Sequence, residues 1–180
     1  FCEIIPSQSR RVNQVVENVL ALSRRDNPQP RQLQLNEYLE EFIQQYKANS
    51  SVNPHITFRN NRQNIEVTFD QSQLDQVMTN LFDNGLRYSA KATGRHTLII
   101  RCYIEPTNEL PQLDIIDQGP GIDDERLSQL FEPFYTTVNK GTGLGLYLCK
   151  ELCEINQASL IYRRTSDGES CFRVVLARQV

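Results

Sequence analysis

The chain has 180 residues, of which 39% are hydrophobic and 23% are charged, and its formal net charge is −3. This length suffices for one well-buried domain with an additional helical arm, and the small negative charge argues against general attraction to nucleic acid. We find neither a signal peptide nor a long apolar run, so we expect these residues neither to cross nor to enter a membrane.

The cysteines form an odd set without the spacing of a zinc ribbon: Cys2, Cys102, Cys149, Cys153 and Cys171. Such a set predicts reduced thiols in a cytoplasmic protein. Cys149 and Cys153 share one face of a predicted helix, where we favour packing in the core over metal binding.

Residues 7–25 are predicted to form a helix that packs against a partner helix. Apolar residues recur there at heptad spacing, notably Ile5, Val12, Val15, Val19 and Leu22. The polar opposite face and the proline-containing linker at 27–30 favour a separate arm over a helix docked on its own domain. Because the chain begins at Phe1 and not at Met, we expect it to be a piece of a longer protein.

Strands and helices alternate after the linker. We predict a strand at 32–35, a helix capped by Asn36, a hairpin of strands 55–59 and 65–69, and a helix over 71–88 capped by Asp70. Further on, we predict strands at 97–105 and 112–116, a short helix at 124–130, a helix from the glycine-rich stretch to about residue 154, and a hairpin of strands 159–164 and 171–177.

The glycine-rich stretch runs through Lys140, Gly141, Thr142, Gly143, Leu144, Gly145 and Leu146. Alternating glycines at a helix N-terminus let backbone N–H groups approach an anion, which predicts a phosphate site. Its lysine precedes the glycines, which excludes a Walker loop, and it does not follow a strand, which excludes a dinucleotide-binding turn. A glycine-rich turn that only caps a helix, without binding a ligand, would show the same sequence pattern.

Two further motifs carry polar side chains. Asn80 and Asn84 lie one turn apart on the helix over 71–88, and Arg87 and Tyr88 extend this edge; it is either a solvated face or a ligand site. Asp117 ends a strand, and the turn after it contains Gly119, Gly121 and Ile122.

In this order, the motifs resemble the four boxes of sensor histidine kinases. Asn80-Leu-Phe-Asp-Asn84 resembles the asparagine box, and Asp117-Gln-Gly119-Pro-Gly121 resembles the first glycine box. Phe131-Glu-Pro-Phe134 and Gly141-Thr-Gly143-Leu-Gly145 resemble the phenylalanine box and the second glycine box. The resemblance covers about residues 33–180 and extends to a superfamily with gyrase, a heat-shock chaperone and the MutL ATPases. The sequence of the phenylalanine box is similar to that of nitrogen- and pilus-regulatory sensors.

The resemblance implies an α+β fold of the Bergerat type, a two-layer α/β sandwich with a mixed, mostly antiparallel sheet. Residues 1–30 would be the second helix of a dimerisation hairpin plus a linker, and residues 31–180 the catalytic ATP-binding domain. The implied ligands are ATP and Mg²⁺. The implied partners are a second copy, through the hairpin, and a response regulator, with activators of an alternative sigma factor as candidates; no nucleic acid is implied. The domain would be cytoplasmic, in a protein that upstream segments anchor to the inner membrane.

The resemblance also implies roles for single residues. Asn84 would bind Mg²⁺ and Asn80 would orient water or metal ligands, both as catalytic residues, while Asp117 would accept from the adenine amine. Arg87 and Lys140 would balance phosphate charge, and Tyr88 would line the pocket. The other nucleotide-binding positions would be Gly119, Gly121, Ile122, Gly141, Thr142, Gly143, Leu144, Gly145 and Leu146. Phe131 and Phe134 would anchor a lid. Gly85 stands where the family usually has alanine, a change expected only to loosen the helix by about 1 kcal/mol.

The phosphate acceptor is the part that the sequence lacks. Neither His55 nor His96 has the acidic neighbour that follows the acceptor histidine of this family, and both fall near predicted strands. We therefore expect the acceptor upstream of Phe1 and no autophosphorylation by this chain.

Two alternatives to a histidine kinase domain remain. A gyrase-like ATPase normally carries glutamate at the position of Asn80, and a scaffold module would keep the fold without turnover.

Overall fold

The structure is a computed structural model that describes residues 27–60, 64–136 and 141–177. Its elements are β1 (Arg31–Gln34), α2 (Leu35–Asn49), β2 (His55–Asn60), β3 (Glu66–Phe69), α3 (Gln71–Thr93), β4 (Thr97–Ile104), β5 (Pro111–Asp117), α4 (Asp124–Leu127), α5 (Gly145–Ile155), β6 (Ser159–Arg164) and β7 (Ser170–Val175). The predicted helix over 7–25, Cys2 and Lys140 lie outside the described residues. None of the described helices combines the length and apolar character that crossing a bilayer requires.

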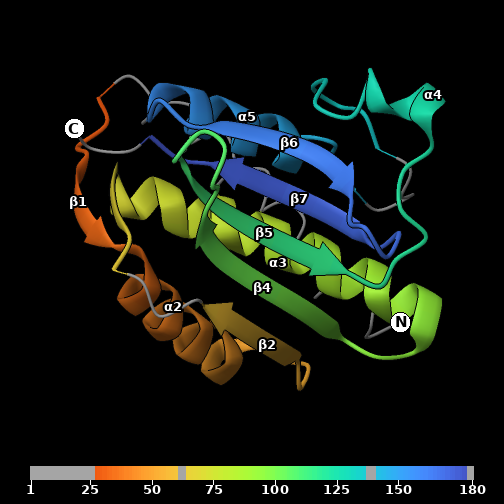
Figure 1. The fold of residues 1–180 in the computed structure, drawn as a ribbon. Helices are drawn as coiled ribbons and strands as arrows, with labels where there is room; N and C mark the ends of the chain where they lie inside the picture. The colour runs from red at the N-terminus through yellow and green to blue at the C-terminus, as the bar shows by residue number, and fades with distance from the viewer. Residues whose placement is uncertain (1–26, 61–63, 137–140, 178–180) are drawn as a thin grey trace.

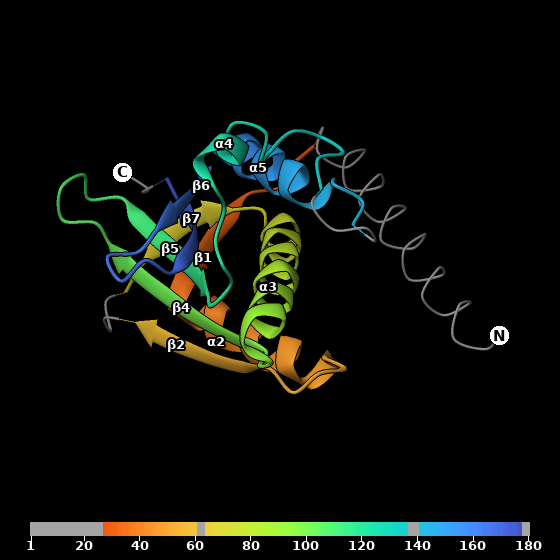
Figure 2. The same cartoon turned by 90° about the vertical axis from the view of Figure 1, so that its right-hand side faces the viewer.

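Five strands form one sheet in the order β2-β4-β5-β7-β6. Only β2 and β4 are parallel, and the other neighbouring pairs are antiparallel. Helices α2, α3 and α5 cover one face of this sheet, with α3 between the other two (Figures 1 and 2). The predicted two-layer α+β fold with a mixed, mostly antiparallel sheet is confirmed.

Helix α3 is the central element of the core. Its apolar side chains recur on one face, and Leu74, Val77, Met78, Leu81 and Phe82 are completely buried. They pack with inward-facing residues of β4, β5 and α5 in one hydrophobic cluster. Asp70 caps the helix, as predicted, because its Oδ1 accepts a hydrogen bond from the Gln73 N–H at 3.1 Å. The helix is longer than predicted and ends at Gly94, whose φ is 74°.

The predicted hairpin of strands 55–59 and 65–69 is wrong. β2 pairs parallel with β4, whereas β3 pairs antiparallel with β1 in a separate two-stranded sheet. Both strands bury their apolar residues, but against different neighbours. The predicted cap at Asn36 is also wrong, because α2 already begins at Leu35, whose N–H donates to the Ile65 carbonyl oxygen at 2.8 Å.

The C-terminal hairpin is confirmed, with Ser159 opposite Val175 and Arg164 opposite Ser170. The described cysteines, Cys102, Cys149, Cys153 and Cys171, are buried and form no disulfide. Cys149 and Cys153 belong to the hydrophobic core, as the sequence predicted. Burial raises the pKa of the Cys153 thiol to about 12, which keeps it protonated at neutral pH.

Candidate functional site

A cavity lies between α3, the loop after β5, the segment around α4 and the start of α5. Most of the residues singled out in the sequence line it: Asn80, Asn84, Arg87, Tyr88, Asp117, Gly121, Ile122, Gly141, Thr142, Gly143, Gly145 and Leu146. Gly119 and Leu144 are not part of this lining. The structure thus brings the asparagine edge, the strand-end carboxylate and the glycine stretch to one place, although they are far apart in the sequence.

Asp117 forms part of the wall of the cavity at the end of β5. Its side chain is 3% exposed, and its carboxylate accepts hydrogen bonds from the Gly119 N–H at 2.7 Å and from the Ser170 hydroxyl at 2.8 Å. Burial raises the pKa of Asp117 above its ordinary value, although these two bonds act in the opposite direction. Each carboxylate oxygen keeps a second lone pair, so this fixed group can accept from an amino group of a ligand.

The two asparagines differ in what holds their side chains. The Asn80 amide nitrogen donates to the Gln76 carbonyl oxygen at 3.1 Å. A Cβ added to Gly145 would lie 3.1 Å from the Asn80 amide oxygen, so the two residues are in close contact. The Asn84 amide oxygen accepts a hydrogen bond from Arg87, whose guanidinium carbon lies 5.4 Å from the centre of the Tyr88 ring. Arg87 therefore holds the oxygen that was expected to bind the metal.

An amide oxygen is a hard ligand that suits Mg²⁺, and Asn84 offers one at the cavity. Within the described ranges, no group of three or more histidine, cysteine, aspartate or glutamate side chains could hold a metal ion. The Asn84 amide oxygen by itself fits a cation that takes its other ligands from phosphate and water, as Mg²⁺ usually does.

The glycine stretch is joined to the phenylalanine box through the backbone. The Phe134 N–H donates to the Gly143 carbonyl oxygen at 3.0 Å, and a Cβ on Gly143 would lie 2.3 Å from the Phe134 carbonyl carbon. Gly143 has a φ of 70°, which favours glycine as well. The side chain of Phe134 is 74% exposed, so this residue does not anchor a lid through its ring. The ring of Phe131 does pack, edge-on to Phe172 at 6.5 Å.

Helix α5 begins at Gly145, and no side chain caps its N-terminus. Gly145 and Leu146, in its first turn, line the cavity, so the N–H groups there are placed to bind an anion. Gly85 was expected only to loosen α3, and the structure shows a packing role for it as well. A Cβ there would lie 2.5 Å from Leu98 Cδ2 and 3.3 Å from Asp117 Cβ, so the glycine lets α3 approach the sheet next to Asp117.

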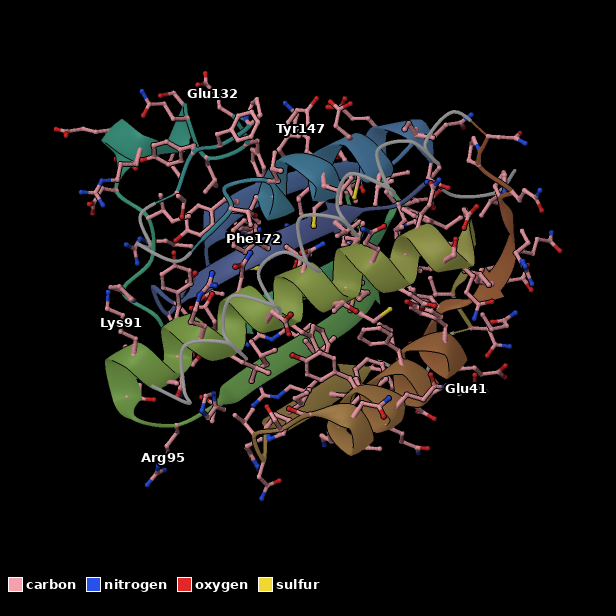
Figure 3. All side chains as sticks on the ribbon, turned by 180° about the vertical axis from the view of Figure 1, so that it is seen from behind. Glu41, Lys91, Arg95, Glu132, Tyr147 and Phe172 are labelled. Atoms are coloured by element: carbon pink, nitrogen blue, oxygen red, sulfur yellow. The ribbon has the colours of Figure 1, made fainter. Side chains whose placement is uncertain are left out.

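Several lining residues were missed in the sequence: Asp83, Asp123, Arg126, Leu130, Tyr135, Thr136, Ser170 and Phe172. Ser170 is the cross-strand partner of Asp117, a relation that exists only once β5 and β7 pair. Phe172 follows from alternation along β7, and Figure 3 shows it on the face of the sheet that the helices cover. Arg126 had a usable signal, because it is a basic residue in the segment between the two glycine boxes.

Comparison with known proteins agrees with this geometry. Residues 69–180 match the family described as histidine kinase-, DNA gyrase B-, and HSP90-like ATPases. The chain belongs to this family. It is 46% identical over 175 residues to the sensor protein kinase PilS of Pseudomonas aeruginosa, covering 97% of the chain but 33% of PilS. The chain is thus a sensor histidine kinase ATP-binding domain. It spans about one third of the length of this curated relative.

Solved structures show the same fold. The catalytic domain of the histidine kinase ThkA has a TM-score of 0.69 at 21% identity, covering 83% of this chain and 96% of that domain. ThkA in complex with the response regulator protein TrrA has a TM-score of 0.76 at 21% identity, covering 98% of this chain and 50% of that one. The histidine kinase fold predicted from the sequence motifs is therefore confirmed.

Proposed function

We propose that this chain binds ATP together with Mg²⁺ in the cavity and transfers the γ-phosphoryl group to a histidine on a helix outside the 180 residues. The observation that carries the proposal is the convergence of Asn84, Asp117 and the glycines at 141, 143 and 145 on one cavity. In this proposal, Asp117 accepts from an amino group, Asn84 supplies an oxygen ligand for a cation, and the helix N-terminus at the glycines binds phosphate of the same molecule.

Each part of the nucleotide has a matching group. The Asp117 carboxylate would accept from the exocyclic amine of adenine, and guanine would leave it facing a carbonyl oxygen. The start of α5 and its glycines would bind the phosphates through N–H groups, and Arg87 and Lys140 would add positive charge. Gly119, Gly121 and Ile122 would let the base lie against the loop, and Tyr88 would close its side.

Asn84 would hold Mg²⁺ by its amide oxygen, and Asn80 would orient a water or a further ligand. Mg²⁺ bound there would neutralise charge on the phosphates. Arg87 donates to that oxygen of Asn84, whose second lone pair would stay available to the cation, and Arg87 would also lie close enough to add positive charge beside the phosphates. Phosphoryl transfer needs mainly positioning and charge neutralisation from a protein, which these groups supply.

The acceptor would be an imidazole nitrogen, which bonds to the γ-phosphorus as the bond to the bridging oxygen breaks and ADP leaves. His55 opens β2 and His96 precedes β4, and neither is among the residues that line the cavity. Residues 1–30 would form the second helix of the hairpin that dimerises the whole protein, and residues 31–180 the catalytic domain. The hairpin would carry the acceptor and pass the phosphoryl group to a response regulator.

Two resemblances support this wider setting. The ThkA structure contains a response regulator protein, and PilS is a sensor kinase. Candidates for this response regulator would include activators of an alternative sigma factor. The domain would lie in the cytoplasm, and upstream segments would anchor the whole protein to the inner membrane. A gyrase-like ATPase is less favoured, because the amide of Asn80 cannot act as the general base that activates water.

Nucleotide binding tests the assignment of the site. Asn84→Ala and Asp117→Ala should each lower the affinity for ATP with Mg²⁺ by at least about tenfold, because each removes a charged or oxygen-donor contact. Titration calorimetry measures the affinity. Asn49→Ala at the exposed end of α2 is the matched control and should bind ATP as the unchanged chain does. Unchanged affinity in both site variants would remove the assignment.

Phosphoryl transfer tests the activity. The chain is mixed with a separate helical hairpin that carries the acceptor histidine, together with ATP labelled on the γ-phosphate. We expect acid-labile label on the hairpin and none on the chain. Label on His55 or His96, located by mass spectrometry, would show that the acceptor assignment is wrong.

A further inference from the structure

Two side chains of β6 contact the loop that carries Asp117. Tyr162 and Arg164 are two residues apart on this strand, so they point to the same face of the sheet. β6 is not a neighbour of β5, because β7 lies between them. The chain after β5 passes the ends of β7 and β6 on its way to α4 (Figure 1). There it forms hydrogen bonds with the Tyr162 and Arg164 side chains.

Arg164 joins this loop to the turn between β6 and β7. Its Nη2 donates to the Pro120 carbonyl oxygen at 3.0 Å, and its Nη1 donates to the Gly168 carbonyl oxygen at 3.0 Å. A Cβ on Gly121 would lie 2.6 Å from the guanidinium carbon and 2.6 Å from each terminal nitrogen. Equal distances to these three atoms mean that the guanidinium lies flat against Gly121, whose φ of 77° and lack of a side chain permit this contact.

Tyr162 holds the next residue of the loop. Its hydroxyl oxygen accepts a hydrogen bond from the Ile122 N–H at 2.9 Å. Its ring packs edge-on to Phe172 at 5.3 Å, and both Ile122 and Phe172 line the cavity. The ring therefore fixes the hydroxyl relative to the cavity wall, and the hydroxyl fixes the loop.

We propose that Tyr162 and Arg164 are positioning residues for adenine recognition: together they hold residues 117–122 in the shape that presents Asp117 and Ile122 to the base. The inference rests on the proposed function, since it assumes that the ligand is an adenine nucleotide. Asp117 is tied to β7 through Ser170, which secures the start of the loop. Its far half, from Pro120 to Ile122, is held by the two β6 side chains through two hydrogen bonds and the contact of the guanidinium with Gly121. A third hydrogen bond ties Arg164 to the turn between β6 and β7.

The test compares two nucleotides in three variants. Tyr162→Phe removes the acceptor of the Ile122 N–H and keeps the ring, and Arg164→Met removes both donors and keeps much of the length. Arg95→Met is the control, because Arg95 is exposed in the loop after α3, at the edge of the molecule in Figure 3. Affinities for ATP and for GTP, with Mg²⁺, are measured by calorimetry, and the midpoint of thermal unfolding is measured without nucleotide.

We expect each β6 variant to lose about tenfold in affinity for ATP and less for GTP, so that selectivity for adenine narrows while the unfolding midpoint changes little. The control should keep both affinities. Unchanged ATP affinity in both β6 variants would overturn the inference, as would an equal loss for both nucleotides with a lowered midpoint, which is the mark of a merely structural role. If the unchanged chain binds no ATP, the proposed function itself fails, and the inference fails with it.

Discussion

At the scale of single residues, Asp117 shows how the fold changes the chemistry of a side chain. Burial raises its pKa above the ordinary 3.8, and this influence is larger than those of the Ser170 and Gly119 hydrogen bonds that lower it. The folded protein therefore takes up a proton on this carboxyl group at a higher pH than the unfolded chain does. Only the ionised form offers all of its lone pairs to a ligand amine.

This shift predicts two pH effects of opposite sign. The contribution of Asp117 to the free energy of unfolding is full below 3.8 and is lost as the pH rises through the raised pKa of the folded state. Affinity for ATP changes in the other direction and weakens as the pH falls through that pKa. Urea unfolding and calorimetry between about pH 4 and pH 7 measure both. Asp117→Asn should flatten both profiles, and a variant with the slopes of the unchanged chain would contradict the assignment.

Gly143 supports a second prediction at this scale. Gly143→Ala would put a Cβ 2.3 Å from the Phe134 carbonyl carbon, so the backbone at Gly143 or at Phe134 must shift. We expect a loss of ATP affinity of about tenfold or more, measured by calorimetry, because the N–H groups that we propose to bind phosphate lie in this stretch and depend on its backbone. Gly94→Ala is the control. The φ of Gly94 is similar, 74°, but an added Cβ would meet nothing within 4 Å, so this substitution should cost about 1 kcal/mol of stability and leave the affinity for ATP unchanged.

At the scale of helices, α3 and α5 are joined at the end that lies away from the glycine stretch. The Asn156 side chain accepts from the Asp70 N–H at 2.8 Å and donates to the Gln73 side-chain oxygen at 2.6 Å and to the Leu152 carbonyl oxygen at 2.8 Å. Asp70 also accepts from the Gln29 N–H in the linker at 2.8 Å. One buried amide therefore fixes α5 against the cap of α3, and Asp70 fixes the linker there too.

Removing this amide should be costly. Asn156→Ala loses three hydrogen bonds and leaves buried groups on both helices unpaired, so we expect the free energy of unfolding to fall by about 3 kcal/mol. Urea denaturation measures it. Asn108→Ala is the control, because the Asn108 oxygen accepts one hydrogen bond, from the Leu110 N–H at 3.0 Å, in an exposed turn. A loss no larger than that of the control would mean that the network does not stabilise the fold.

At the scale of the whole molecule, the two faces of the sheet are built differently. The described helices α2, α3 and α5 cover one face (Figure 2). The other face carries a buried ion pair. Arg173 Nε lies 2.6 Å from Asp114 Oδ1, and its Nη2 donates to Asp114 Oδ2 at 2.8 Å and to the Tyr103 hydroxyl at 2.6 Å. Burial and the nearby Asp114 raise the pKa of Tyr103 to about 12.

Removing one partner of a buried ion pair destabilises the fold strongly, because the other charge is left buried and unpaired. Arg173→Met leaves the Asp114 carboxylate buried without its partner, so we expect a loss of about 3 to 5 kcal/mol in the free energy of unfolding. The double variant Asp114→Leu with Arg173→Met removes both charges and should recover most of that loss. Thermal and urea unfolding measure the two variants. A double variant as unstable as the single one would show that the pair itself is required.

The local patterns of the sequence were enough for much of this protein. The apolar stripe of α3, its cap at Asp70 and the hairpin of β6 and β7 follow from spacings within about twenty residues. The four boxes were enough for the family, because short runs of residues in this order resemble those of sensor histidine kinases and residues 69–180 match the family. Asn84 and Asp117 could be singled out in this way before their distance in space was known.

Other features depend on contacts between segments far apart in the chain. β2 and β3 have similar local patterns, yet β2 pairs with β4 and β3 with β1, because each strand buries its apolar residues against a different part of the core. Ser170, Tyr162 and Arg164 reach the Asp117 loop only because β7 and β6 follow β5 in the sheet. Residue spacing determines which element forms, whereas burial and strand order determine which side chains meet, and the proposed adenine site depends on burial and strand order.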